Sequence, residues 1–450
     1  MNIEVSKVKR IVVVICQIIL GCVFIFSGYA KAVDPYGSYY KIQDYLTAFG
    51  WDALLPLAFV AGVLLCAAEF LLGICLLLGA NLKTTSILTL IFMAFMTPLT
   101  LYIALTDPVS DCGCFGDALV ISNWATFWKN IVFSILAIIV YYLRKYSPNL
   151  FSQRTDWIIA IYAGCFSICV SLYCLVNLPI IDFRPYKNGT NIPQSMEIPD
   201  GAEPDLYETT LIYEKDGVQK EFSMDNYPSN DSSWVFVDSK NVLVKKGYEP
   251  PIHDFTMEHP DLGDITEDVV SNPGYTFLLV SHRVEKADTN KRKEIAAIYD
   301  YARANGYDFY CMTATGLETK EMEEYKIESG GVEYPFVNTD EITLKTIVRS
   351  NPGLVLIKDG VVINKWSNKN MPTFTDPLEN SPRGQVQQPN DWRVVFLSLV
   401  LFIVPLILVF SFFIAILLNQ KFKGRMWVRA LFFLPVVVSC GVVMRLDNQA

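Results

Sequence analysis

Charged residues are scarce in this chain of 450 residues: they make up 18% of it, whereas 52% is hydrophobic. Soluble domains usually carry about 25% charged residues, so the composition indicates that part of the chain belongs in a membrane. Basic residues are outnumbered too, with 37 Lys and Arg against 46 Asp and Glu, for a formal net charge of −9. Because nucleic acid binding needs clustered positive charge, we expect no nucleic-acid partner.

Long apolar runs take the place of the missing charge. About 20 apolar residues in a helix cross the hydrocarbon core of a membrane. Six runs are read as spans of this kind: 11–29, 54–78, 84–105, 128–143, 157–178 and 394–418. No small-residue cleavage site follows the first run, so we expect it to be an uncleaved helix. The chain is therefore predicted to be polytopic and to contact membrane lipid.

Basic residues in the short loops predict the orientation of the spans. In alternate connections they are Lys7, Lys9 and Arg10, then Lys83, then Arg144, Lys145 and Arg154, then Lys421, Lys423, Arg425 and Arg429. The opposite short loops hold only Lys31, Lys41 and Lys129. The richer set should face the cytoplasm. Residues 30–53, the loop at 106–120 and the block 180–391 then lie on the far side. We expect a cell inner membrane with a periplasmic domain.

The block after the fifth run is polar and reads as folded. Residues 180–250 look β-rich, with two alternating runs in YETTLIYEKDGVQKEFSM and a further hairpin in WVFVDSKNVLVKKG. Over 251–367 the pattern is strand, helix ended by Gly306, strand, helix, and two strands around a KDG turn. This order is that of a thioredoxin-like α/β sandwich. Residues 368–391 read as a linker before a C-terminal membrane segment at 392–450.

The stretch SDCGCFGD places Cys112 and Cys114 one residue apart in a polar far-side loop. A closed metal site needs four ligands, and all three histidines (His253, His259 and His282) stand in the polar block, so we expect no metal. The two sulfurs could instead form a structural bridge for the loop. A third hypothesis is a redox pair, because residues two apart form a strained ring and strained, exposed disulfides tend to be labile.

Charged residues near this loop help to decide between a structural bridge and a redox pair. Asp111 and Asp117 oppose thiolate formation, so Lys31 or Lys41 would have to favour it. Lys31 stands where the first run ends and could also simply snorkel. Glu69 lies inside the second run, where a carboxyl costs about 3 kcal/mol to insert, so it should face the bundle or a cavity. It could contact a quinone or substrate, relay protons, or hydrogen-bond a neighbouring helix as a protonated carboxyl.

The chain resembles a known family on FIFSGYAKAVDPYGSYYKIQDYL (24–46), AAEFLLGICLLLG (67–79) and SDCGCFGD (110–117). It is similar to the DoxX-like superfamily, and most to the branch of the methylamine-utilisation protein MauE. The resemblance implies a four-helix inner-membrane domain over 1–146, which a fifth helix at 156–179 would follow. MauE-like proteins are associated with disulfide formation or electron transfer in the maturation of periplasmic enzymes, and DoxX relatives with sulfur oxidation coupled to quinone.

On this resemblance Cys112 and Cys114 would be the redox pair, and Glu69 and Lys31 would assist them in the membrane. The same resemblance implies a membrane quinone as electron acceptor and a periplasmic protein as substrate or partner. We expect the chain itself to bind no further cofactor.

Residues 251–367 are similar to periplasmic thioredoxin-like domains of the TlpA type, through IHDFTMEHPDLGDITEDVV and SNPGLVLIKDGVVINKW, with Pro352 at the place of the usual cis-proline. Where those domains carry Cys-x-x-Cys, this chain reads SHRVEKADTNK. Cys311 stands alone on a predicted strand, as a core residue would. The domain is therefore expected to bind a partner rather than exchange disulfides itself.

The sequence thus predicts a multi-domain protein with a polytopic α-helical membrane bundle and a periplasmic α/β thioredoxin-like domain, acting in thiol–disulfide redox. One alternative is a non-catalytic, membrane-anchored binding or assembly module. A third possibility is a transport-related permease fragment, because 412–446 resembles an early part of sugar-type ABC permeases.

Overall fold

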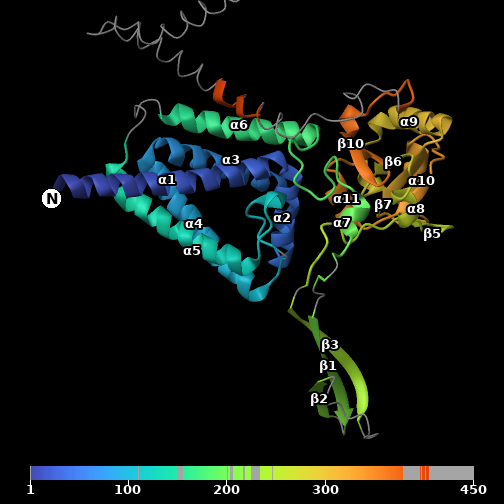
Figure 1. Cartoon of the computed structure of the whole chain (residues 1–450), viewed down its shortest axis with the longest axis horizontal. Coiled ribbons are helices and arrows are strands. Elements are labelled where there is room, and N and C mark those ends of the chain that lie inside the picture. Colours follow the sequence, from blue (N-terminus) through green and yellow to red (C-terminus); the bar gives the residue numbers. More distant parts are fainter. Residues whose placement is uncertain are drawn as a thin grey trace, which may run out of the picture. The chain divides into compact units, whose positions relative to one another are not determined.

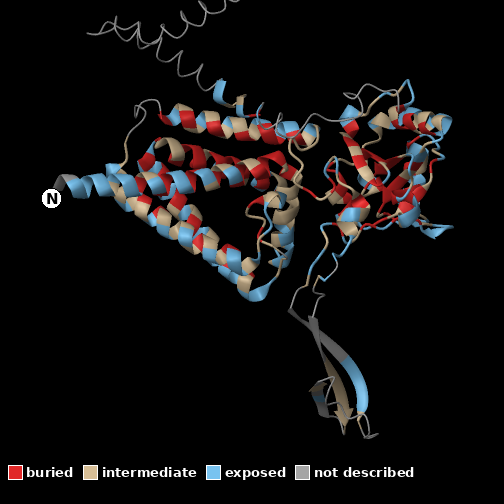
Figure 2. Cartoon of the chain, in the orientation of Figure 1, coloured by how far each residue is buried: buried red, intermediate tan, exposed pale blue. Residues whose placement is uncertain are grey.

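The structure is a computed structural model of the chain (Figure 1). It describes residues 2–378, with gaps at 110, 149–155, 200, 203–205, 216–217, 224–233 and 246, together with 396, 398–400 and 402–404. The chain divides into a helical unit, Met1–Cys174 with Pro389–Ala450, and a sheet unit, Leu175–Gln388. In Figure 2 the buried residues gather in the middle of the helices and in the central sheet, so each unit has its own core.

Five long helices account for the first five apolar runs. They are α1 (Asn2–Val33), α3 (Ala58–Leu78), α4 (Leu82–Thr106), α5 (Asn123–Leu143) and α6 (Asp156–Val176). All five are long and apolar enough to cross a membrane, which confirms those spans as membrane-capable helices. Helix α5 begins before the predicted run because Ser122 caps it, with its hydroxyl accepting from the Ala125 amide. The sixth run, 394–418, falls almost wholly outside the described residues.

Helices α1 and α3 pack side by side at very short range (Figure 1). The buried face of α1 follows helical spacing through Val13, Cys16, Leu20 and Phe24. Further along the same helix, a Cβ atom on Gly28 would lie 2.4 Å from the backbone nitrogen of Phe70. Small residues at such crossings let two membrane helices approach closely. The two helices can therefore cross this closely only because residue 28 is a glycine, which has no Cβ atom.

A short helix that the sequence did not predict follows α1. Helix α2 (Pro35–Ala48) starts at Asp34, whose carboxylate accepts from the Gly37 amide, and has Pro35 in its first turn. In Figure 1 it lies across the ends of the long helices. The 3-10 turn η1 (Asp52–Leu57) then leads into α3.

The sheet unit is built on a seven-stranded mixed sheet in the order β10-β9-β6-β7-β8-β4-β5. Its strands are β4 (Glu258–His259), β5 (Gly263–Asp264), β6 (Tyr275–Val280), β7 (Asp308–Thr313), β8 (Phe336–Asn338), β9 (Gly353–Lys358) and β10 (Val361–Ser367). Strands β6, β7 and β8 are parallel, while β9 runs antiparallel to β6 and to β10. The peptide bond before Pro352 is cis, as its predicted position requires.

Helices cover both faces of this sheet. One core joins the sheet to α9 (Arg292–Asn305) and α10 (Lys320–Glu328), and the other joins it to α7 (Ile192–Met196), α8 (Thr266–Val270) and α11 (Glu341–Ile347). Helix α9 ends at Gly306, which has a positive φ of 72°, as predicted. Cys311 has no exposed surface and packs within the first core, so its prediction as a core residue is confirmed.

A separate three-stranded sheet has the order β2-β1-β3. It consists of β1 (Leu206–Lys215), β2 (Val218–Ser223) and β3 (Val235–Lys245). The predicted pairing of the first two strands is confirmed. The hairpin predicted within WVFVDSKNVLVKKG is wrong, because Asp238, Ser239 and Lys240 continue one strand along the edge of β1. A register shift next to Tyr213 accommodates them in the ladder.

We predict that Gly28→Ala lowers the stability of the helical unit by about 1–3 kcal/mol, because the added methyl group must push two backbones apart. Gly62→Ala in α3 is the matched control, since its Cβ would lie 3.5 Å from Ser38 Cβ, an ordinary contact. Thermal unfolding of the full chain in detergent measures both. Equal unfolding temperatures for the two variants would contradict the close crossing.

Candidate functional site

A buried ion pair lies where α1 crosses α3. The Nζ atom of Lys31 is 2.7 Å from both carboxylate oxygens of Glu69. The two residues are only 6% and 3% exposed. Removing two charges from water is costly, so a pair of this kind persists only with good geometry and further hydrogen bonds. The short α1–α3 distance supplies that geometry.

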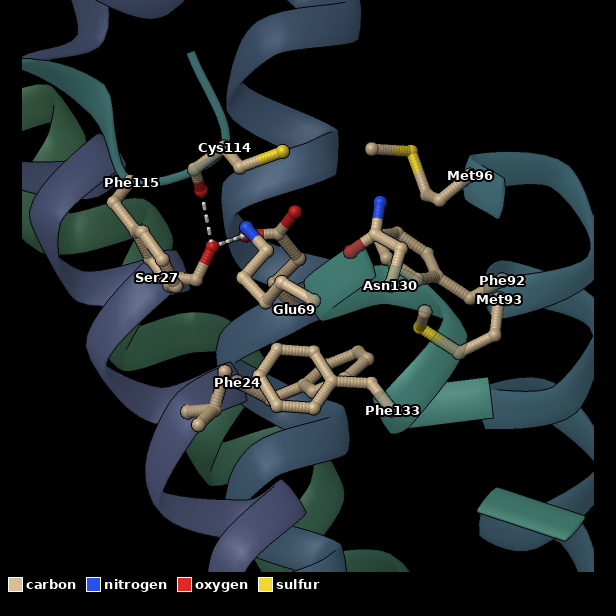
Figure 3. Close-up of a pocket in the computed structure, with 12 residues that line it drawn as sticks. Phe24, Ser27, Glu69, Phe92, Met93, Met96, Cys114, Phe115, Asn130 and Phe133 are labelled. Atoms are coloured by element: carbon tan, nitrogen blue, oxygen red, sulfur yellow. Dashed lines mark hydrogen bonds between the residues drawn. The ribbon is translucent and has the colours of Figure 1, made fainter. Parts of the chain in front are cut away.

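Ser27 joins this ion pair to the cysteine loop. It stands one turn before Lys31 on α1, and its hydroxyl accepts a hydrogen bond of 3.0 Å from Lys31 Nζ. The same oxygen lies 2.7 Å from Glu69 Oε2 and 2.6 Å from the carbonyl oxygen of Cys114. Because a hydroxyl has one proton, Ser27 donates to one of these two acceptors at a time. Figure 3 shows both contacts.

The loop brings the two cysteine sulfurs face to face. The Sγ atoms of Cys112 and Cys114 lie 2.6 Å apart, so little movement closes an S–S bond of about 2.05 Å. Gly113 between them has a φ of 63°, a conformation that most side chains disfavour. The carboxylate of Asp111 accepts from the Gly113 amide at 2.6 Å and so fixes the turn. The loop is shaped to hold the sulfurs together.

Helix α2 packs against the outer side of this loop. The hydroxyl of Tyr45 donates to the Cys112 carbonyl at 2.7 Å, and Lys41 forms an ion pair of 2.6 Å with Asp111. The side chain of Lys41 also lies beside Gly113, where a Cβ would be 3.0 Å from Lys41 Cγ. Cys112 is consequently only 6% exposed. A protein partner can reach it only if this contact opens.

A small cavity of about 40 Å³ opens on the inner side of the pair. Its lining is Val23, Phe24, Ser27, Glu69, Phe92, Met93, Met96, Cys114, Phe115, Lys129, Asn130 and Phe133. In Figure 3 the Cys114 sulfur, the Glu69 carboxyl group and the Asn130 amide all face this space. One water needs about 10–15 Å³ by this kind of measure, so the cavity has room for a few waters. It is too small for a quinone ring.

The two thiols differ in acidity. The hydrogen bond from the Cys112 thiol lowers the pKa of Cys114 to about 7, against the opposing effect of burial, and the charges of Lys129 and Lys31 act in the same direction. That same hydrogen bond, followed by burial, raises the pKa of Cys112. A thiol with a pKa near 7 is about half ionised at pH 7, and the thiolate is the reactive form. Cys114 is thus the more nucleophilic of the pair at neutral pH.

The structure brings together all four residues predicted from the sequence, Cys112, Cys114, Glu69 and Lys31. The alternative that Lys41 supplies the charge favouring a thiolate is not what the structure shows, because Asp111 neutralises it. Ser27 was missed, although its spacing of four residues from Lys31 is a signal for one helix face. Tyr45 was missed because the sequence does not predict α2. Lys129 counts in the sequence only as one of the basic residues that indicate the orientation of the spans.

We predict that Lys31→Met destabilises the helical unit by about 3–5 kcal/mol, because it leaves the Glu69 carboxylate buried without its cation. The double variant Lys31→Met/Glu69→Leu should recover most of the loss, since two apolar side chains replace the pair. Thermal unfolding in detergent compares them. A single variant as stable as the wild type would show that the ion pair is unimportant for the fold.

We predict that Lys41→Ala speeds modification of reduced Cys112 by a thiol reagent several-fold, because it removes the ion pair that holds α2 against the loop. Gln43→Ala on the same helix is the control, since Gln43 bonds to Tyr39 of that helix at 2.8 Å and, among the described residues, makes no bond to the loop. Site-resolved mass spectrometry measures the rates. Identical rates in the two variants would mean that α2 does not control access.

Comparison with protein families matches two parts of the chain. Residues 207–246, which include β1 to β3, match a family described as a domain of unknown function (DUF8463). Residues 9–143, which include α1 from its eighth residue onward, α2 to α5 and the whole candidate site, match the family described as methylamine utilisation protein MauE. No curated protein and no solved structure matches the chain. The helical unit that carries the cysteine pair is therefore a multi-pass membrane domain similar to the MauE family.

Proposed function

We propose that this protein carries out thiol–disulfide redox at the periplasmic face of the inner membrane, with Cys112 and Cys114 as the exchanging pair. The observation that carries the proposal is the placement of two facing sulfurs against a buried, charged cluster. A bridge that only stapled the loop would need neither Lys31 nor Glu69 beneath it, and burying those charges is costly. The match of residues 9–143 to the MauE family supports a role in methylamine utilisation.

The proposed exchange starts with the pair as a disulfide. A thiolate of the partner protein attacks one sulfur of the pair, the S–S bond breaks, and a mixed disulfide forms. The second thiol of the partner then resolves it. The partner gains one disulfide, and Cys112 and Cys114 become the two-electron-reduced dithiol. A periplasmic enzyme that needs a disulfide to mature is the class of substrate that fits.

A membrane quinone would return the pair to the disulfide. It takes two electrons from the reduced pair and, over the whole cycle, the two protons that the partner's thiols release, and it leaves as quinol, so the cycle balances. Because the inner cavity is too small for its ring, the quinone would meet the site from the lipid side. The Glu69 carboxylate faces the cavity with Cys114, and Ser27 and Lys31 hold it there. It is placed to accept a proton when the dithiol is oxidised.

The sheet unit would serve as the partner-binding part of the protein. Its order of parallel and antiparallel strands and its cis Pro352 are in keeping with a thioredoxin-like fold. After β6, however, the chain continues with Ser281, His282 and Arg283 and not with cysteine. The one cysteine among its described residues, Cys311, is sealed in the core. We therefore assign disulfide exchange to the membrane loop alone.

One observation favours a second function. Helix α2 shields Cys112 from solvent, as it would if the two sulfurs were a permanent fastening of the loop. The protein would then be a membrane-anchored binding or assembly module without redox turnover. Partners recovered with Cys112→Ser/Cys114→Ser as efficiently as with the wild type would support this alternative.

The redox state of the pair in cells tests the proposal. Alkylation of growing cells, followed by mass spectrometry, should find Cys112 and Cys114 mainly oxidised during respiration and mainly reduced when respiration is blocked, because quinol then accumulates. Cys112→Ser and Cys114→Ser should each abolish function, whereas Cys165→Ser, at an exposed cysteine of α6, should not. A pair whose oxidation state stays the same under both conditions would rule out turnover.

A further inference from the structure

Lys129 faces the same cavity as Cys114 but has a different setting from the other lysines of the site. It lies on α5, near its start, and its Nζ atom stands 4.2 Å from the centre of the Phe115 ring, directly beside the cysteine loop. Lys31 is paired with Glu69, and Lys41 with Asp111. Among the residues that the structure describes, no carboxylate forms a salt bridge with Lys129.

The charges around the cavity are therefore unequal. Two charged side chains line it, Lys129 and Glu69. Lys31 does not line the cavity, but its ion pair with Glu69 at 2.7 Å already balances that carboxylate and leaves the charge of Lys129 without a counterpart in the wall. The outer pair of Lys41 and Asp111 adds none on balance. Charges interact strongly in a partly buried site, because little water screens them. One further negative charge in the cavity would balance the wall, and the Cys114 sulfur is the remaining group there that can supply it.

Resting on the function proposed above, we infer that Lys129 is the positioning residue that keeps Cys114 as the thiolate of the reduced pair. The remaining groups around the pair agree with this assignment. The two sulfurs lie 2.6 Å apart, so the Cys112 thiol donates to the Cys114 sulfur whenever Cys114 is the thiolate. Tyr45 contacts Cys112 through its carbonyl rather than its sulfur. The lowered pKa of Cys114 has the charge of Lys129 among its causes, whereas Glu69 opposes it.

This assignment gives the two sulfurs separate tasks. A thiol of lower pKa is the better leaving group in disulfide exchange. The partner thiolate would thus attack the Cys112 sulfur, and the electron pair of the broken S–S bond would leave on Cys114. The mixed disulfide joins the partner to Cys112, which lies beneath α2. Cys114 lies beside Lys129 and lines the cavity. It is the sulfur from which electrons would pass to the quinone.

The test is the pH dependence of Cys114 alkylation in the reduced full-length chain, purified in detergent and resolved by mass spectrometry. In the wild type the rate should rise with a midpoint near pH 7. In Lys129→Met the midpoint should move upward, toward that of an ordinary thiol at about 8.5. A pKa higher by one lowers the thiolate fraction at pH 7 about fivefold, and the rate falls with it.

Three further variants make the outcome specific. Lys129→Arg keeps the charge and should keep the wild-type midpoint. Lys129→Gln should behave as Lys129→Met, and it serves if the methionine variant fails to fold. Gln43→Ala on α2 removes a neutral side chain and no charge, so it should leave the midpoint near 7. A midpoint unchanged in the two neutral variants, or faster alkylation at Cys112 than at Cys114, would overturn the inference. The assay needs neither quinone nor partner, so its failure is distinct from that of the redox proposal.

Discussion

The ion pair between Lys31 and Glu69 is the interaction on which the helical unit is organised. It forms only because Gly28 lets the backbones of α1 and α3 come within contact distance. Two charges in a membrane domain are difficult to justify on stability alone, since apolar side chains of similar size would serve as well or better. Their position below the cysteine loop, with Ser27 between, provides the reason to keep them.

The cysteine loop has two unlike sides. On the outer side, α2 holds the backbone of Cys112 through Tyr45 and the turn through Lys41. On the inner side, Cys114 faces a small cavity lined mainly by apolar and aromatic side chains, with Glu69, Lys129 and Asn130 among them. Two sulfurs only 2.6 Å apart thus have different surroundings, Cys112 beneath α2 and Cys114 beside the cavity between the helices. Under the proposed function, electrons would pass from a partner protein at Cys112 to an acceptor on the side of Cys114.

Much of this architecture could be predicted from the sequence, because apolar runs and strand alternation are local patterns. The four central site residues were likewise recognisable: two cysteines in a polar loop, one carboxyl inside an apolar run and one lysine at the end of another stand out from their surroundings. Helix α2 was not, since its Tyr-rich sequence lacks an apolar stripe and its start depends on the cap at Asp34. Strand β3 was divided in two because DSK looks like a turn, and only the long edge of β1 keeps it extended. The proposed role of Lys129 depends on its sharing a cavity with Cys114, and a local sequence pattern does not show which distant residues share a cavity.

Cys311 has a consequence for any chemistry performed on the thiols of this protein. It is enclosed between the central sheet and the helices α9 and α10, and burial raises its pKa far above that of an ordinary thiol. Cys311 therefore does not react with thiol reagents while the sheet unit is folded, and it becomes reactive only when that unit unfolds. Labelling of Cys311 therefore reports whether the sheet unit is folded at the time when the other cysteines are labelled.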